Sequence, residues 1–225
     1  MKKKLWNVCR RVLSILLNLA VVWMEPTAAR LSWEAVGTQM FTFYTENSNF
    51  FTAGVCLLMA LFQLKALLTG REIPLWVKRL KFIATCCLTM TFMTVVLVLA
   101  PYCQEEGGVV FLLTASSMLY HHLLNPRCAF VSLVFLEREP RLSGRNVFCA
   151  LIPTLLYGSI AVYANVRRWI AGPYPFLLVY EQSIRQSAEW LVAIVCMNLF
   201  YAWLVWKAGG NGKKKHPGLL FRKTA

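Results

Sequence analysis

The sequence predicts an all-α fold, a polytopic membrane bundle of six transmembrane helices with both termini in the cytoplasm. Hydrophobic residues make up 58% of the chain and its mean hydropathy is +0.53, whereas soluble domains are about half apolar. Charged residues make up only 15%, against about a quarter in soluble domains. Apolar stretches close to the roughly 20 residues that cross a hydrocarbon core recur along the chain. We therefore expect a transmembrane domain over residues 1–207 and a basic cytoplasmic tail, disordered, over 208–225.

The six spans are expected at residues 5–24, 41–68, 80–100, 109–136, 146–166 and 185–207. The first contains Arg10 and Arg11, whose long side chains can extend to the interface. The second ends before the turn at Gly70, and the third is stopped by Pro101. The fourth carries strongly polar residues near its middle. The fifth and sixth are separated by 169–182 (WIAGPYPFLLVYEQ), which is too short to cross and is expected at the outer interface.

The distribution of Lys and Arg predicts the orientation. With an inside amino terminus, basic residues concentrate in the cytoplasmic segments 2–11, 65–81, 138–145 and 207–223. The outer segments then hold only Arg30, Arg167, Arg168 and Arg185. This asymmetry follows the positive-inside rule. It also accounts for the net charge of +14, so no nucleic-acid partner is expected.

An alternative for the first span is a signal peptide. MKKK followed by a short apolar core is typical of such a peptide, with cleavage near PTAAR at 26–30. The arginine pair and the bulky exit WMEP favour a retained helix instead. Cleavage would leave the topology of the other five spans unchanged, so the charge distribution does not decide between the two.

Polar residues recur at helical spacing in the fourth span: Thr114, Ser117, His121, Asn125, Cys128 and Ser132. These intervals of three and four residues define one helix face. His121 lies on this face, whereas His122 is rotated by about 100°. Pro126 removes one backbone hydrogen bond and is expected to kink the helix. A histidine in a membrane is costly enough to indicate a function, either chemistry or the support of a hydrogen-bond network.

The second span carries a matching stripe of Thr45, Ser48, Thr52, Met59 and Gln63, with Cys56 beside it. Polar and small residues in membrane helices mark the faces that meet other helices or a cavity. Further polar residues crowd the outer ends of the second and sixth spans. The sequence therefore predicts a polar pocket in the outer half of the bundle, with the supporting residues Glu46, Asn49, His122, Asn125 and Glu189.

No metal or cofactor is expected. Most of the eight cysteines lie in apolar runs, where cysteine acts as a small hydrophobe, and no CxxC occurs. Only Cys103 falls in an outer loop, so no disulfide framework is expected either. His121 and His122 are neighbours and point apart on a helix, which makes them a poor metal site.

Three stretches carry a resemblance to a known family: FYTENSNFFTAGV, YHHLLNPRCAFVSLVFLE and GPYPFLLVYEQSIRQSAEWLVAIVCMNLFYAWL. Together with the number of spans, they resemble the androgen-induced-gene-like membrane proteins, and most closely their six-helix bacterial relatives. Characterised animal members hydrolyse fatty acid esters of hydroxy fatty acids with an intramembrane threonine and histidine. By position, the resemblance implies that Thr45 is the nucleophile and that His121, five residues before Pro126, is the base. The run ENSN after Thr45 departs from the animal proteins, which are more apolar there.

The implied chemistry has two requirements. A threonine hydroxyl needs an adjacent base, and a third group normally orients that base; without any aspartate in the chain, this group would be Glu46, Glu189 or Asn125. Depth is the second requirement. Thr45 lies near the outer end of its span and His121 about a dozen residues into its own, an axial offset of about 18 Å. A fourth helix that starts outside the bilayer, or that tilts, would remove this offset.

The sequence leaves three functions open. The first is a Thr45/His121 hydrolase in a bacterial plasma membrane, with membrane lipids as surroundings and a lipid ester as substrate. The second is a transporter, lipid-binding protein or sensor in which His121, Asn125 and Glu189 bind a ligand or a proton. The third is a purely structural role for the polar stripes. The oligomeric state is not predicted.

Overall fold

A computed structural model describes residues 2–105, 107–138 and 140–210, with side chains from Leu5 onward. The described part is helical and contains no strand. Its α-helices are α1 Lys2–Val36, α2 Tyr44–Thr69, α3 Leu75–Thr94, α4 Gly108–Thr114, α5 Asn125–Val131, α6 Arg145–Cys149, α7 Leu151–Val166 and α8 Ile184–Ala208. Short π-helices lie at Val95–Leu99, Leu119–Leu124 and Ser132–Leu136, and 3-10 helices at Gly37–Thr42, Ala100–Cys103 and Pro175–Leu177. Most of the basic tail expected at 208–225 lies outside the described residues.

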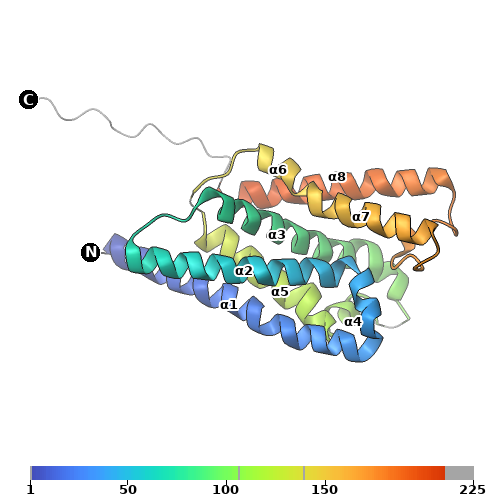
Figure 1. Cartoon of the computed structure of the whole chain (residues 1–225), viewed down its shortest axis with the longest axis horizontal. Coiled ribbons are helices and arrows are strands. Elements are labelled where there is room, and N and C mark those ends of the chain that lie inside the picture. Colours follow the sequence, from blue (N-terminus) through green and yellow to red (C-terminus); the bar gives the residue numbers. More distant parts are fainter. Residues whose placement is uncertain (1, 106, 139, 211–225) are drawn as a thin grey trace, which may run out of the picture.

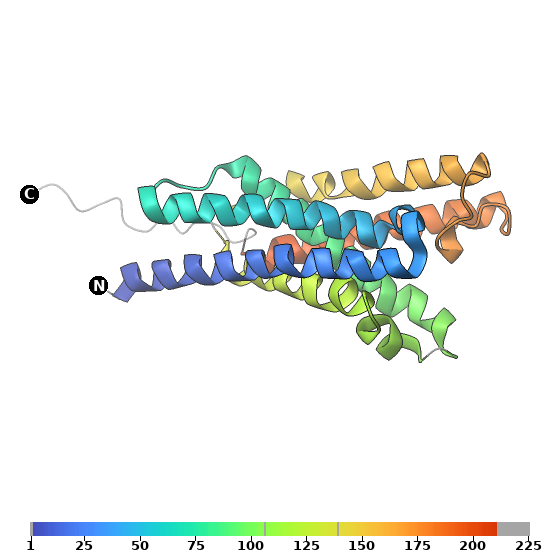
Figure 2. The ribbon, with the colours of Figure 1, turned by 60° about the horizontal axis from the view of Figure 1, so that its bottom comes forward.

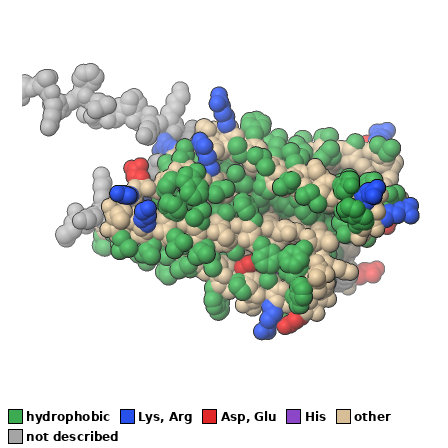
Figure 3. Space-filling model, viewed as in Figure 1, with side chains coloured by type: hydrophobic (Ala, Val, Ile, Leu, Met, Phe, Trp, Pro, Cys, Tyr) green, Lys and Arg blue, Asp and Glu red, His purple; other side chains and the backbone are tan. Residues whose placement is uncertain are grey.

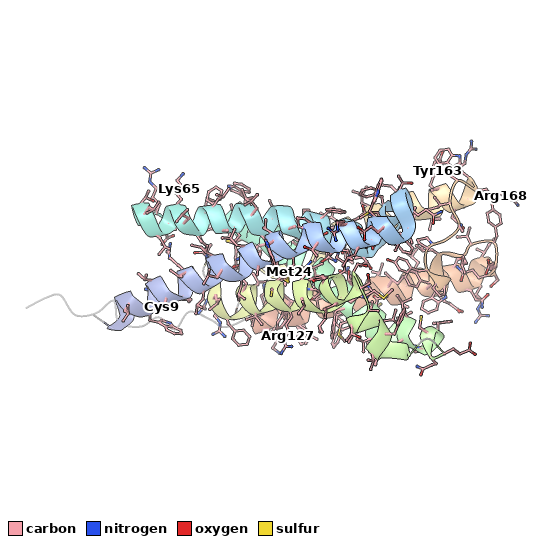
Figure 4. All side chains as sticks on the ribbon, turned by 90° about the horizontal axis from the view of Figure 1, so that it is seen from below. Cys9, Met24, Lys65, Arg127, Tyr163 and Arg168 are labelled. Carbon is pink, nitrogen blue, oxygen red and sulfur yellow. The ribbon has the colours of Figure 1, made fainter. Side chains whose placement is uncertain are left out.

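The long helices run side by side along one axis (Figures 1 and 2). The start of α1 and the α2–α3 turn lie at the same end of the bundle, and α8 ends in the half of the bundle nearer to it (Figure 1). We call that end the first end. The opposite end, which we call the second end, holds the segments 37–43, 100–118 and 167–183. Figure 4 shows Lys65 at the first end, Arg168 at the second, and Met24 between them.

Five helical stretches of the described chain are long and apolar enough to cross a membrane: Leu5–Thr42, Tyr44–Thr69, Leu75–Cys103, Arg145–Val166 and Ile184–Ala208. Their outward faces are apolar. On α7, for example, Ile152, Leu156, Ile160 and Tyr163 recur at three- and four-residue spacing and are each more than half exposed. Figure 3 shows hydrophobic side chains over much of the drawn face, with most Lys and Arg toward its ends. Such a surface would be costly in water, and it is the surface of an integral membrane protein.

The interior of the bundle combines an apolar core with polar faces. Toward the first end, α3, α5, α6 and α8 pack around Phe82, Leu133, Val147 and Val205. By contrast, α1 and α2 bury polar side chains. The stripe expected on α2 is buried throughout, from Thr45 to Gln63.

The first helix is longer than expected. Its span is predicted to end at residue 24, yet α1 continues through Pro26 to Val36, about 50 Å in all. The cause is its inward face, which is buried at Ser14, Asn18, Val21, Glu25, Ala28 and Ser32. These intervals of three and four residues keep one face against the bundle on both sides of the proline. Residues expected in an outer loop therefore contribute to the interior.

The fourth segment differs from the continuous helix expected over 109–136. After α4 the chain leaves helical geometry at Ala115, and Ser116 takes a left-handed conformation with φ 46°. The Met118 N–H donates to the Ala115 carbonyl, which closes a tight turn before the chain resumes as a π-helix. The polar stretch around His121 thus belongs to a shorter helical run, which is not among the five apolar stretches.

Candidate functional site

The centre of the candidate site is a histidine between two carboxylates. His121 Nε2 lies 3.5 Å from Glu25 Oε2, and its Nδ1 lies 3.8 Å from Glu46 Oε1. All three residues are at most 9% exposed. Ser32 on α1 donates to the same Glu46 oxygen at 3.2 Å. The parts of α1 and α2 near the second end therefore surround His121 with acidic groups, which can orient its ring.

Two asparagines connect this centre to Thr45. Asn125 Nδ2 donates to Glu25 Oε2 at 3.0 Å and to Asn49 Oδ1 at 3.1 Å. Asn49 Nδ2 in turn donates to the backbone carbonyl of Thr45 at 2.8 Å and lies 3.3 Å from that of His121. Both amides are fully buried. One amide group therefore links the backbones of the two residues implied as nucleophile and base.

Thr45 and His121 consequently lie at the same level of the bundle, and the axial offset of about 18 Å expected between them is absent. The break at Ala115–Ser116 is the reason. The residues before it form α4 and the turn, so the helical run that carries His121 begins only after the break. Among the described residues, however, no hydrogen bond joins the two side chains directly. The Thr45 hydroxyl instead lies 3.4 Å from the Tyr174 hydroxyl.

Thr45 occupies the first turn of α2 and lines a cavity of about 460 Å³. The wall is mainly apolar and comes from α3, α7, α8 and the segment 174–179. The hydroxyl-bearing residues of the lining are Tyr44, Thr45, Thr91, Thr94, Thr154, Tyr157, Ser159, Tyr174 and Ser187. An apolar cavity with a few hydroxyl groups suits an amphiphile with a polar group next to a long apolar chain.

His122 and Glu189 lie apart from this centre. His122 is buried like its neighbour, and its Nδ1 lies 2.6 Å from the Leu112 carbonyl of α4. It is buried because α4 covers it and because the 3.6-residue period does not hold in the π-helix around it. Glu189 is on the surface of α8, where Arg185 donates to it at 2.8 Å. The structure therefore does not bring Glu189 to the other candidates. Arg127 is exposed and points away from the bundle (Figure 4).

Several polar atoms in the centre have no hydrogen-bond partner among the described residues. These are Glu25 Oε1, Glu46 Oε2, His121 Nε2 and Asn125 Oδ1. Buried polar atoms in proteins are nearly always paired, with protein groups, ordered water or a ligand, so these four atoms are open to a partner from outside the chain. No three His, Cys, Asp or Glu side chains of the described chain are grouped closely enough to hold a metal ion.

The structure also contains a second buried polar cluster, which the sequence reasoning did not single out. Lys81 is fully buried, and its Nζ donates to Asn18 Oδ1 at 2.6 Å and to Cys56 Sγ at 3.0 Å. Asn18 Nδ2 donates to Glu137 Oε1 at 2.7 Å, so its amide bridges the two charged residues. Ser14 and Ser132 also donate to this carboxylate. We call these residues the inner cluster, since all of them are buried between the helices.

Glu25 and Tyr174 are the members of the site that the sequence reasoning missed. Glu25 lies just beyond the expected first span, although its spacing of seven from both Asn18 and Ser32 on α1 indicates a shared face. Tyr174 lies in a segment expected only at the membrane interface. Comparison of the chain with protein-family models, with curated proteins and with solved structures gives no match.

Proposed function

We propose that this membrane protein is a hydrolase of lipid esters, with Thr45 as nucleophile and His121 as general base. The observation that carries the proposal is the position of Thr45. Thr45 lines an apolar cavity, and its backbone is joined through Asn49 to that of a buried histidine. An acyl chain in the cavity would present its carbonyl carbon to the Thr45 hydroxyl.

The chemistry would proceed by an acyl-enzyme. His121 takes the hydroxyl proton as Thr45 Oγ1 bonds to the ester carbon, and the alcohol then leaves with that proton. Water, activated by the same histidine, cleaves the acyl-enzyme. Glu25 and Glu46 supply the carboxylates that orient the ring and stabilise the imidazolium. The Thr45–His121 hydrogen bond has to form when substrate binds, since catalytic hydrogen bonds are often long or absent without substrate.

The position of the cavity supports entry of the substrate from the bilayer. Leu155 and Val162 on α7 and Leu191 on α8 line the cavity and are also 43%, 38% and 58% exposed. These residues belong to the apolar outer surface of the bundle. A lipid in the adjacent leaflet can therefore reach the cavity between α7 and α8 without leaving the hydrocarbon.

A fluorophosphonate probe tests the proposal, because such probes react covalently with activated hydroxyl nucleophiles. Purified protein in detergent is treated with the probe, with Thr45→Ala and His121→Ala beside the wild type. Thr52→Ala is the matched control, since Thr52 is buried on the same helix and lies outside the cavity. The proposal expects labelling of the wild type and of the Thr52→Ala protein only. A folded wild type that takes up no label would reject it.

A second function, proton-coupled transport, is favoured by the two carboxylates that face one histidine. Three ionisable groups buried together with unpaired oxygen atoms are typical of a proton-binding site in a membrane carrier. Liposomes that contain the protein and an internal pH-sensitive dye discriminate the two functions. A carrier would give proton flux that Glu25→Gln and His121→Ala abolish and that Thr45→Ala leaves unchanged. The hydrolase proposal expects no flux above that of empty liposomes.

A further inference from the structure

We propose that Tyr174 is a catalytic residue of this site, a hydroxyl donor that stabilises the negative charge formed when Thr45 attacks the ester. The inference rests on the proposed hydrolase function. It assigns a role to the segment 169–182, which the sequence indicates only as an interfacial loop.

The segment that carries Tyr174 has a defined structure. Asn165, at the end of α7, donates to the Ile170 carbonyl at 3.1 Å and accepts from the Val179 N–H at 3.2 Å, so one side chain fixes both ends. Between them the backbone passes so closely that a Cβ on Gly172 would lie 2.4 Å from the Leu177 carbonyl oxygen. This closure holds the backbone that carries Tyr174 in one conformation.

Two neighbouring aromatic rings hold the ring of Tyr174 in place. It stacks on Phe176 at 5.1 Å between centroids and meets the edge of Phe43 at 6.0 Å. The residue is 9% exposed and lines the cavity next to Thr45. The ring is therefore directed so that its hydroxyl, rather than its apolar edge, reaches the start of α2.

The hydroxyl of Tyr174 contacts the implied nucleophile at two points. It accepts from the Thr45 N–H at 3.3 Å and lies 3.4 Å from Thr45 Oγ1. Because its oxygen accepts from the backbone, its own proton is available for Thr45 Oγ1 or for a carbonyl oxygen bound beside it. Burial raises the pKa of Tyr174 to about 12, so the phenol keeps that proton at neutral pH.

This geometry suits the charge that moves during acylation. Negative charge develops first on Thr45 Oγ1 as its proton passes to His121, and then on the carbonyl oxygen as the new C–O bond forms. Tyr174 is adjacent to both positions and keeps its proton throughout, so it donates a hydrogen bond and transfers nothing. Preorganised donors of this kind are usually a large part of catalysis in acyl transfer.

The test is Tyr174→Phe, which retains the ring and its aromatic contacts and removes only the hydroxyl. Initial rates on a p-nitrophenyl acyl ester are measured for the full-length protein in detergent, alongside melting temperature. Loss of one such donor is expected to lower kcat by roughly 10²-fold, with KM and the melting temperature nearly unchanged. Tyr180→Phe is the matched control, because its hydroxyl donates to the Val166 carbonyl on the exposed side of the same loop.

A second variant separates chemistry from packing. Phe43→Leu removes a ring that supports Tyr174 and keeps the hydroxyl, so it should lower the melting temperature more than kcat. An unchanged kcat in Tyr174→Phe, a loss that appears only in KM, or an equal loss of kcat in Phe43→Leu would each overturn the assignment of Tyr174. In those cases Thr45→Ala would still be inactive, and the hydrolase proposal would stand. A wild type without esterase activity would overturn both.

Discussion

At the scale of single residues, the site depends on how His121 is oriented. Both of its ring nitrogens face a carboxylate, Glu25 on one side and Glu46 on the other. A neutral imidazole bonded to a carboxylate through one nitrogen has its other nitrogen free to act as a base. Glu46 follows Thr45 directly in the sequence. We therefore expect His121 Nδ1, the ring nitrogen that faces Glu46, to exchange protons with the nucleophile.

Replacement of Glu46 by glutamine tests this orientation. The change keeps the size of the side chain and an oxygen for Ser32, and it removes the charge beside Nδ1. Because the imidazolium loses its stabilisation, we expect kcat for ester hydrolysis to fall at least tenfold. The upper limit of the loss is the roughly 10²–10⁴-fold that general base catalysis contributes in total. Esterase assays at constant pH measure the effect.

Glu189→Gln is the control for that experiment. This glutamate is exposed on α8 and paired with Arg185, away from the histidine. Loss of the Glu189 carboxylate should leave kcat within about twofold of the wild-type value, as is usual for a surface change. Equal rates for Glu46→Gln and the wild type would show that the Glu46 carboxylate does not stabilise the imidazolium.

Part of the site could be predicted from residue types and spacing. The polar face of α2 follows from helical periodicity and is buried as expected, whereas periodicity sets His121 apart from His122 and the structure buries both. Tyr174 could not be found this way, because its position is determined by a loop closed through Asn165 and Gly172. Glu25 was missed because the sequence WMEP indicates a helix end, whereas packing continues the helix through Pro26.

At the scale of helices, the inner cluster connects elements that are distant in sequence. The amide of Asn18 on α1 joins Lys81 of α3 to Glu137 at the end of the fourth segment. Gln63 of α2 donates to Ser14, which extends the same network. Charges buried in this way need their partners, since an unpaired one loses its hydration without compensation.

Removal of one charge from the inner cluster should therefore destabilise the bundle. For Lys81→Met or Glu137→Gln we expect the free energy of unfolding to fall by about 3–5 kcal/mol, as for other buried pairs. The double variant should lose clearly less than the sum of the two. Unfolding in mixed micelles by titration with a denaturing detergent measures these differences.

Lys65→Met serves as the reference, since Lys65 is exposed near the end of α2. It should change the free energy of unfolding by less than about 0.5 kcal/mol. If Lys81→Met behaved in the same way, the network would contribute nothing to stability.

Helix boundaries were the less predictable part at this scale. Apolar length alone predicts one helix over 109–136, but the chain turns at Ala115–Ser116, where Ser116 adopts φ 46°. A serine in left-handed geometry leaves no sequence signal comparable to a glycine. The turn is nevertheless what brings His121 level with Thr45, so the feature most important for the site was also the hardest to anticipate.

At the scale of the whole molecule, the fold class follows from composition. Apolar residues outside and polar residues inside are the arrangement that a bilayer favours, and the described chain has it. The number of passes is a separate matter. Five stretches meet the requirements of length and hydropathy, and we propose that 118–136 is the sixth pass despite its polar centre.

Six passes put the two ends of the bundle on opposite sides of the membrane. A cysteine at Arg71, on the α2–α3 turn, should react with an impermeant maleimide only in inside-out vesicles. A cysteine at Arg168, at the second end, should react only in right-side-out vesicles or intact cells. Labelling of both from the same side would contradict the six-pass topology and cytoplasmic termini.

The central claim is that Thr45 carries an acyl group during turnover. The most direct measurement is to mix the protein with a p-nitrophenyl acyl ester, quench with acid within the first turnovers, and map the modified peptide by mass spectrometry. The account predicts one added acyl group on Thr45, with none on the Thr45→Ala protein. An unmodified Thr45 during active hydrolysis, or an acyl group on another residue, would contradict it.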